Sequence, residues 1–473
     1  MNGLMVEPKY RPALDPGFVP AELWNRAYEA WAASDPGSTP LVVAVTRSDG
    51  TVFSHETRIA PHESENVPLN LKYVERTVKL LLWMKGGSGI VIAGQPELAR
   101  AMSGLYSPEG ARSFDCDLLG RRIFLEPMTV RSCDLDVVPE EKTAAVSLGG
   151  NVDGCRIGFD LGGSDRKCAA VVDGEVVHSE EVEWNPYFES DPRYHFDGIM
   201  DSLRRAAAHL PRVDAIGGSA AGVYVDNEPR AGSLFRGISD EDFEREIRMI
   251  FKKIRHEMND VPFEVVNDGE VTALSASLAF DTSRILGVAM GTSLAAGYCD
   301  GAGRITSQLN ELAFVPVDYR DDAPVDEWSG DVGCGVQYFS QQAVARLAPA
   351  AGLEYPDHTP FAERLADVQS LVERGDERAR RIYESIGVYL GYSVAWFARW
   401  YEIDNLLTLG RVTSGVGGEI IIETALEVLR DEFPELADHL RMKTPDERFR
   451  RHGQAIAAAS LPVLSSTPYL LND

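Results

Sequence analysis

The chain has 473 residues, enough for roughly two or three domains that each bury a core of their own. Its 46 basic and 73 acidic residues give a formal net charge of −27, which argues against a nucleic-acid-binding surface and against binding to an anionic membrane. A local pocket that holds a cation can still accept a polyphosphate in a chain of this charge.

The six cysteines include no Cys-x-x-Cys pair, which is typical of reduced, cytosolic usage. The N-terminus lacks the apolar core of a signal peptide. No stretch approaches the ~20 apolar residues that span a bilayer. We therefore expect a cytoplasmic protein without a membrane partner.

Residues 1–150 alternate helical and strand patterns. We predict helices over residues 20–33, 71–84 and 96–106, and strands over residues 41–45, 51–58, 89–93 and 122–130. The glycine-rich residues 86–89 lack the Gly-Lys-Ser/Thr of a P-loop, so we interpret them as a helix end and a turn. These patterns predict a mixed α/β domain over residues 1–150 with no assigned chemistry, and a linker over residues 140–152.

From residue 155 onward, strands and helices alternate again, which predicts a second α/β region over residues 151–473. Strand patterns cover residues 155–160, 168–172, 176–184, 215–219, 263–266, 284–290, 296–299, 304–307 and 406–409. Helical patterns cover residues 197–209, 240–258, 270–279, 337–347, 365–374, 377–400, 419–433 and 453–459.

The first strand of this region ends in a carboxylate and a glycine turn. Its apolar run reaches Asp160, and Gly162, Gly163 and Ser164 follow. Glycines let backbone N–H groups approach an anion closely, and Asp160 could hold a hydrated Mg²⁺ against phosphate oxygens. Taken alone, the segment also fits an ordinary hairpin with no ligand.

Three later strands end in similar turns. They are Asn267-Asp268-Gly269, Gly291-Thr292-Ser293, and Gly410 followed by Gly417-Gly418. Strand ends are where α/β folds place their ligands. Asp268, rigidly supported after a strand, suits a general base, although an aspartate there also suits a helix N-cap.

The order and spacing of these segments resemble the ROK family of sugar kinases and regulators, within the actin/hexokinase-like ATPase superfamily. The resemblance covers residues 155–460, and the matching segments are residues 160–167, 217–222, 266–274, 291–297, 311–314, 330–340, 387–390 and 406–418. It implies a two-lobed, ribonuclease H-like, actin/hexokinase-type ATPase fold, here with an added N-terminal domain.

The resemblance also implies a role for each matching residue. Asp268 would be the catalytic base that takes a proton from a sugar hydroxyl, and Asn267, Glu311 and Gly222 would bind the sugar. Asp160 would hold Mg²⁺. The nucleotide phosphates and adenosine would lie against Asp160, Gly162, Gly163, Ser164, Lys167, Gly291, Thr292, Ser293, Gly410, Gly417 and Gly418.

The chain departs from the family's pattern at its zinc site, which needs three cysteines and a histidine. Glu327 and Ser329 stand at two cysteine positions, Phe314 replaces the histidine, and only Cys334 remains. One thiolate cannot complete a tetrahedral site, so we predict no zinc. Val336 replaces a sugar-contacting glutamate, which makes the expected pocket more apolar.

Simpler interpretations remain open for several residues. Glu311 also fits a surface position on a strand, and Cys334 fits a buried structural thiol. Trp396, Trp400 and Tyr401 fit a packed core or a subunit interface.

The resemblance implies an ATP-dependent, glucokinase-like hexose kinase that uses ATP and Mg²⁺ on a hexose or hexose-like molecule and forms a homodimer. The alternative is a non-catalytic sugar- or nucleotide-sensing regulator, because the family also includes repressors. The altered zinc and sugar positions favour that alternative. An N-terminal region that is not a helix-turn-helix, and the intact Asp268 and phosphate turns, argue against it.

Overall fold

The computed structural model describes residues 4–63, 65–143, 148–443 and 447–464. The chain forms two compact units. The first unit comprises residues 1–145, 288–296 and 307–443, and the second comprises residues 146–287, 297–306 and 444–473. The N-terminal region therefore belongs to the same compact unit as residues 307–443.

A five-stranded sheet organises the second unit, in the order β11-β8-β5-β6-β7. Its strands are β5 (Cys155–Leu161), β6 (Asp165–Val172), β7 (Glu175–Glu183), β8 (Ala215–Ala220) and β11 (Phe263–Asn267). β5, β6 and β7 pair antiparallel, whereas β8 is parallel to β5 and β11 is parallel to β8. The carboxyl ends of β5, β8 and β11 consequently meet at one edge of the sheet.

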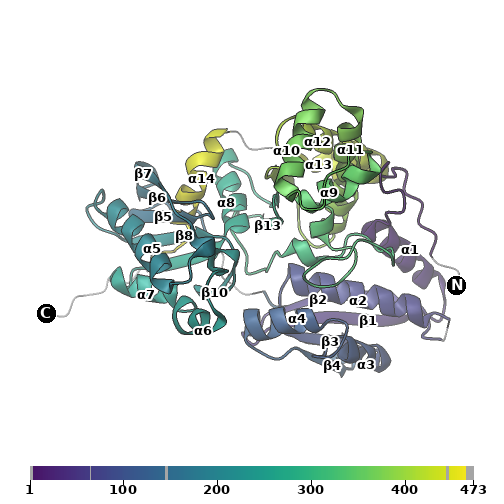
Figure 1. Ribbon diagram of the computed structural model, residues 1–473. Coiled ribbons are helices and arrows are strands. Elements are labelled where there is room, and N and C mark those ends of the chain that lie inside the picture. The colour runs from purple at the N-terminus through teal and green to yellow at the C-terminus, as the bar shows by residue number, and fades with distance from the viewer. Residues whose placement is uncertain (1–3, 64, 144–147, 444–446, 465–473) are drawn as a thin grey trace. The chain divides into compact units, whose positions relative to one another are not determined.

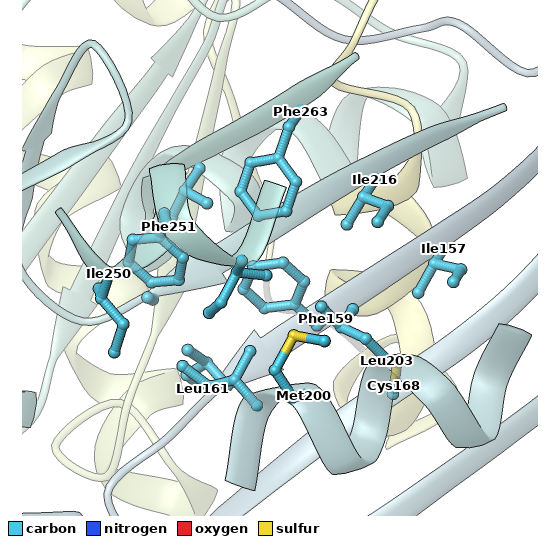
Figure 2. Packing of buried hydrophobic residues seen from close by; sticks show 14 of the residues in the cluster. Ile157, Phe159, Leu161, Cys168, Met200, Leu203, Ile216, Ile250, Phe251 and Phe263 are labelled. Atoms are coloured by element: carbon cyan, nitrogen blue, oxygen red, sulfur yellow. The ribbon is translucent and has the colours of Figure 1, made fainter. Parts of the chain in front are cut away.

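Helices α5 (Pro192–Ala207) and α7 (Ile250–Glu257) pack on one face of this sheet (Figure 1). Figure 2 shows the apolar side chains between them. The ring of Phe159 lies 6.0 Å from the rings of both Phe251 and Phe263, measured between centroids. Burial of these side chains is the main contribution that holds the helices to the sheet.

The opposite face carries α14 (Glu447–Ala459), which also packs against α8 (Asp268–Phe280) (Figure 1). Gly158 of β5 and Gly217 of β8 are partners in the strand register. A Cβ at Gly158 would overlap the carbonyl of Ala455, and one at Gly217 would overlap the carbonyl of Ala458. These two glycines let the helix backbone lie directly on the sheet.

The N-terminal part of the first unit contains a four-stranded sheet in the order β2-β1-β3-β4. Its strands are β1 (Thr39–Thr46), β2 (Val52–Ile59), β3 (Gly89–Ala93) and β4 (Thr129–Cys133), and its helices are α1 (Ala21–Ser34), α2 (Val67–Met84) and α3 (Pro96–Leu105). Helix α2 packs on β1, and α3 packs against β3 and β4 (Figure 1).

The rest of the first unit surrounds a sheet in the order β13-β12-β14-β15. The strands are β12 (Ile285–Met290), β13 (Leu294–Cys299), β14 (Asn405–Leu409) and β15 (Arg441–Lys443), and the helices are α9 (Gln341–Ala350), α10 (Phe361–Glu373), α11 (Glu377–Phe397), α12 (Gly415–Glu432) and α13 (Pro434–His439). The boundaries between the two units fall within β12 and β13.

Some sequence predictions of secondary structure were wrong in part. The strand expected over residues 122–130 is replaced by a π-helix, η1 (Cys116–Phe124), and β4 begins only at Thr129. The helix expected over residues 240–258 is divided into α6 (Asp240–Asp242), a π-helix η5 (Phe243–Ile247) and α7. The strand expected over residues 304–307 reduces to isolated bridges at Ile305.

Shorter elements complete the chain. They are α4 (Ser113–Asp115), the hairpin β9 (Val223–Val225) and β10 (Glu228–Ala231), and the 3-10 turns η2 (Leu135–Val137), η3 (Pro186–Phe188), η4 (Ser233–Phe235), η6 (Leu312–Phe314) and η7 (Gly335–Gln337). Within the described ranges, none of the helices combines the length and the apolar character that crossing a membrane requires.

Candidate functional site

Asp160 lies buried near the carboxyl end of β5, with 6% of its surface exposed. Its register partners are Lys167 on β6 and Ser219 on β8. The hydroxyl of Ser219 donates a hydrogen bond of 2.7 Å to Asp160 Oδ1. Burial raises the pKa of Asp160 to about 6, and the negative charge of Asp268 contributes to that increase. A positive charge beside this carboxylate would offset the cost of its burial.

The glycine turn after Asp160 is held by aromatic residues. Gly162 N donates to Asp165 O at 2.9 Å. The indole N–H of Trp184 donates to Gly162 O at 2.8 Å, and the backbone N–H of Trp184 donates to Ser164 O at 3.1 Å. A Cβ at Gly163 would overlap the ring of Tyr187. The second glycine of the turn is thus required by packing.

Lys167 faces the same end of the sheet as Asp160. Its Nζ lies 2.7 Å from Asp165 Oδ1. Burial alone would lower the pKa of Lys167, but the hydrogen bond to Asp165 and the charge of Asp160 raise it above its usual value. The side chain therefore remains a cation beside the turn.

Asn267 connects β11 to α8 and caps the helix. Its Oδ1 accepts a hydrogen bond of 2.7 Å from Gly269 N, and its Nδ2 donates one of 2.7 Å to Gly222 O. The N-cap role considered for Asp268 therefore belongs to Asn267. Gly222 has a φ of 134°, a conformation that glycine adopts more readily than other residues.

Asp268 is the first residue of α8, and its Oδ1 accepts a hydrogen bond of 3.0 Å from Gly269 N. Burial raises the pKa of Asp268, while its bonds to backbone N–H groups oppose the increase. A carboxylate with a raised pKa is a stronger base than one in water.

The second unit brings these predicted residues together because three parallel strands end at one edge. Leu161 of β5 and Asn267 of β11 both have Ala220 of β8 as their register partner. The turn after Asp160, Gly222 and Asp268 consequently lie at neighbouring strand ends. Two carboxylates, of which Asp268 helps to raise the pKa of Asp160, lie beside a glycine turn and a lysine.

In the first unit, the structure brings two of the predicted turns together. Gly291 N donates to Ser293 O at 2.9 Å, which closes the turn around Thr292. Val412 N donates to Met290 O at 3.1 Å, so the segment after β14 lies against the end of β12. Gly410 has a φ of 92° and leaves no room for a Cβ beside the backbone of Met290.

Gly417 and Gly418 lie buried in the first turn of α12. A Cβ at Gly417 would overlap the ring of Tyr383, and one at Gly418 would overlap the carbonyl of Thr413. Close packing therefore explains both glycines, and it leaves their N–H groups at the N-terminus of an 18-residue helix, where anions are stabilised.

Glu311 is half-buried and precedes the 3-10 turn η6, so it does not lie on a strand. Its backbone N–H donates to Trp83 O at 3.0 Å. Three residues later, the ring of Phe314 lies 4.2 Å from that of Trp83. Tyr401 is buried, and its hydroxyl donates to Asn310 Oδ1 at 2.7 Å.

The residues at the positions of the family's zinc ligands differ in side-chain chemistry and in solvent exposure. Glu327 is exposed, Ser329 donates to Asp326 Oδ2 at 2.6 Å, and Cys334 is buried. Burial raises the pKa of Cys334 to about 12, so it remains a thiol near neutral pH. In the part of the chain that the structure describes, no three or more His, Cys, Asp or Glu residues are grouped as metal ligands would be.

Sequence reasoning did not single out Ser219, Trp184 or Tyr187. Ser219 was available as the last residue of a predicted strand, and it bonds to Asp160. The two aromatic residues follow β7 and could not be linked to the glycine turn by spacing, because the link depends on the return of the chain after the strand.

No protein-family model matches the chain, and no curated protein matches it. Among solved structures, the ROK hexokinase from Thermus thermophilus superposes with a TM-score of 0.52 at 18% identity, over 65% of this chain and 97% of that one. A ROK family transcriptional regulator, a homologue of the E. coli MLC protein, gives a TM-score of 0.49 at 17% identity, over 66% of this chain and 79% of that one.

A ROK family glucokinase from Streptomyces griseus, solved with glucose and AMPPNP, gives a TM-score of 0.44 at 22% identity, over 65% of this chain and 99% of that one. The similarity to the Thermus hexokinase shows that this chain has the actin/hexokinase-type fold of ROK proteins, with an extra region beyond it. The fold prediction is confirmed. Solved proteins that resemble the chain include sugar kinases and a transcriptional regulator.

Proposed function

We propose that this protein is an ATP-dependent kinase that phosphorylates a hydroxyl group of a hexose or a hexose-like molecule. The observation that carries the proposal is the placement of Asp160, Asp268 and the turn of Gly162–Ser164 at one edge of the five-stranded sheet. Phosphoryl transfer depends mainly on positioning and on charge stabilisation, so few side chains are needed.

Asp268 is proposed as the general base. Its carboxylate would accept the proton of the acceptor hydroxyl as that oxygen attacks the γ-phosphate. The burial that raises its pKa increases its basicity. Asn267, through Gly222, fixes the backbone around it, and Asn267, Gly222 and Glu311 are proposed to contact the acceptor.

Asp160 is proposed to hold a Mg²⁺ that arrives with ATP. A buried carboxylate at a strand end, with a pKa raised to about 6, fits a hard cation that prefers oxygen ligands. When bound, Mg²⁺ neutralises charge on the phosphates. Nucleotide contacts are proposed for Gly162, Gly163, Ser164, Lys167, Gly291, Thr292, Ser293, Gly410, Gly417 and Gly418.

The proposal is tested by ADP release from Mg-ATP with glucose, N-acetylglucosamine, mannose, fructose and allose as acceptors. We expect turnover with one of them, and a loss of about 10²–10⁴-fold in kcat for Asp268→Asn. Asp281→Asn is the matched control because Asp281 is exposed at the opposite end of α8 in a left-handed conformation that asparagine accepts. Equal rates for Asp268→Asn and the wild type would overturn the base assignment.

Silence across the panel, with sugar binding still detectable by thermal shift, would instead indicate the regulator alternative. That outcome would fit the apolar residues Phe314 and Val336 at positions where the resembling family has polar ones. We also propose a homodimer and a cytoplasmic location, which light scattering and cell fractionation would check.

A further inference from the structure

The C-terminal end of helix α2 binds the backbone of the segment that carries Glu311. Three successive N–H groups donate to the last three carbonyls around the helix end: Leu309 N to Lys85 O at 3.3 Å, Asn310 N to Met84 O at 3.0 Å, and Glu311 N to Trp83 O at 3.0 Å. The last carbonyls of a helix have no partner within the helix. Residues 309–311 supply these partners, so the end of α2 fixes their position.

Arg47, at the end of β1, holds both sides of this contact. Its Nε donates to Gly86 O at 2.9 Å, and its Nη2 donates to Lys85 O and, at 2.8 Å, to Ser307 O. A guanidinium is favourable near the negative end of a helix dipole. The same side chain therefore links the end of α2 to the residues just before Leu309.

Side chains of α2 also hold the residues that follow Glu311. The ring of Trp83 lies 4.2 Å from that of Phe314, and its indole N–H donates to Asp115 Oδ1 at 3.0 Å. Asp331 accepts two bonds of 3.1 Å from Arg76 and lies 2.9 Å from Lys79 Nζ. Asp331, Arg76 and Lys79 are all buried.

The residue before Glu311 has a left-handed backbone conformation, which asparagine adopts more readily than most residues. Asn310 has a φ of 58°, in the left-handed region, and its side chain accepts the bond from the buried hydroxyl of Tyr401. The backbone angles of Asn310 set the direction in which the chain enters Glu311. The end of α2 and Tyr401 together determine where Glu311 lies.

From these contacts we propose that the N-terminal region positions the acceptor-binding segment: the end of α2 and Arg47 form a clamp, the α2 clamp, that orients Glu311 toward the acceptor molecule. This inference rests on the proposed function, since it assumes that Glu311 contacts the acceptor. The residues of the α2 clamp are positioning residues, because they act through Glu311. Displacement of a binding group by about 1 Å can cost about 100-fold in rate.

The test is the variant Arg47→Met in the full chain, which replaces the guanidinium side chain by an apolar one and removes the donors to Gly86, Lys85 and Ser307. We expect the KM for the acceptor to rise about 10-fold or more, while the KM for Mg-ATP changes less than about 2-fold. Arg47→Lys should restore part of the acceptor affinity. Arg58→Met is the matched control because Arg58 is an exposed arginine on β2 whose guanidinium bonds to Ser38.

Hydrogen exchange provides a readout that does not need catalysis. In the wild type, the amides of Leu309, Asn310 and Glu311 are bonded to α2 and should exchange slowly. In Arg47→Met their exchange should accelerate about 10-fold or more, while that of β5 in the second unit is unchanged. If Arg47→Met does not fold, Trp83→Phe replaces it, with the same expected direction.

The outcomes separate the two ideas. An active wild type whose Arg47→Met and Trp83→Phe variants keep the same acceptor KM would overturn the positioning role and leave the kinase proposal intact. Unchanged amide exchange at residues 309–311 would overturn the α2 clamp itself. A wild type that phosphorylates no acceptor would overturn the proposed function, and the positioning role with it.

Discussion

At Asp160, burial and ionisation oppose each other. The carboxylate is needed in its charged form to hold a cation, yet burial raises its pKa to about 6. The folded protein therefore binds a proton on Asp160 more tightly than the unfolded chain does. The stabilisation from this proton is fully present below about pH 4, near the unfolded pKa, and is lost as the pH rises through about 6.

The raised pKa of Asp160 leads to a prediction for the stability of Asp160→Asn in metal-free buffer. At pH 7 the variant should be more stable than the wild type by roughly 3 kcal/mol, because a shift of about two pKa units is removed. The difference should disappear near pH 4, where the wild-type carboxyl is protonated in both states. Denaturant unfolding at the two pH values checks it, and equal stabilities at pH 7 would contradict it. The proposed kinase activity should be lost in the same variant.

The residue types at strand ends made part of the site predictable from sequence. Asp160 follows an apolar run directly, Asp268 follows one after Asn267, and the parallel order of their strands then places them at one edge. The packing roles of Gly163 and Gly417 could not be predicted, because the rings of Tyr187 and Tyr383 reach them from distant parts of the chain. The roles of these residues in binding stay predictions.

At the scale of elements, the contact between α14 and the five-stranded sheet depends on the absence of two side chains. Gly158 and Gly217 leave the backbone of α14 in direct contact with β5 and β8. The axis of a helix normally lies about 10 Å from the sheet on which it packs, because side chains separate the two backbones. Here the separation is smaller, and the fit is correspondingly intolerant of added atoms.

We predict that Gly158→Ala destabilises the protein by about 3 kcal/mol or more, because the new methyl group would overlap the carbonyl of Ala455 and α14 would have to move. Gly104→Ala provides the contrast. Gly104 lies in α3 with no atom near the position of a Cβ, so alanine should stabilise that helix by about 0.5–1 kcal/mol. Thermal unfolding of both variants measures the difference, and a neutral Gly158→Ala would contradict the contact.

Long periodic elements were predictable, and short apolar runs were not. The helices α1 and α11 and the strand β3 follow from clear periodicity. The apolar run Ile123–Leu125 suits a strand as well as a helix end. In the structure it forms the end of the π-helix η1, with a left-handed cap at Leu125. The hairpin of β9 and β10 was missed because its strands have only three and four residues.

At the scale of the molecule, Asp331 ties the N-terminal region to the later part of the first unit. Arg112 Nη1 lies 2.6 Å from Asp331 Oδ1, in addition to the contacts of Arg76 and Lys79. Burial alone would raise the pKa of Asp331, but these three cations hold it well below its usual range. Its contribution to stability is therefore present above about pH 4 and is lost as the pH falls further.

Asp331→Asn should lower the free energy of unfolding at pH 7 by about 3–5 kcal/mol, because the buried Arg76 and Lys79 and the half-buried Arg112 lose their shared partner. The two segments of the first unit, residues 1–145 and 307–443, should lose protection from hydrogen exchange together. Exchange of peptides from α2 and α12 would show this. Asp322→Asn is the control, since the side chain of Asp322 is 90% exposed, and its effect should stay within about 0.5 kcal/mol. Loss of protection in α2 alone would contradict a single cooperative unit.

The glycine-lined face of the five-stranded sheet has a consequence for how the chain folds as it is made. β5 and β8 are synthesised long before α14, because residues 307–443 all lie between β8 and α14 in the sequence. At typical ribosomal rates the interval is on the order of tens of seconds. During that time α14 does not yet cover the glycine-lined face of the sheet. The first unit can therefore complete its core before the second unit does. We expect a chaperone to bind the nascent chain most strongly while this face is exposed.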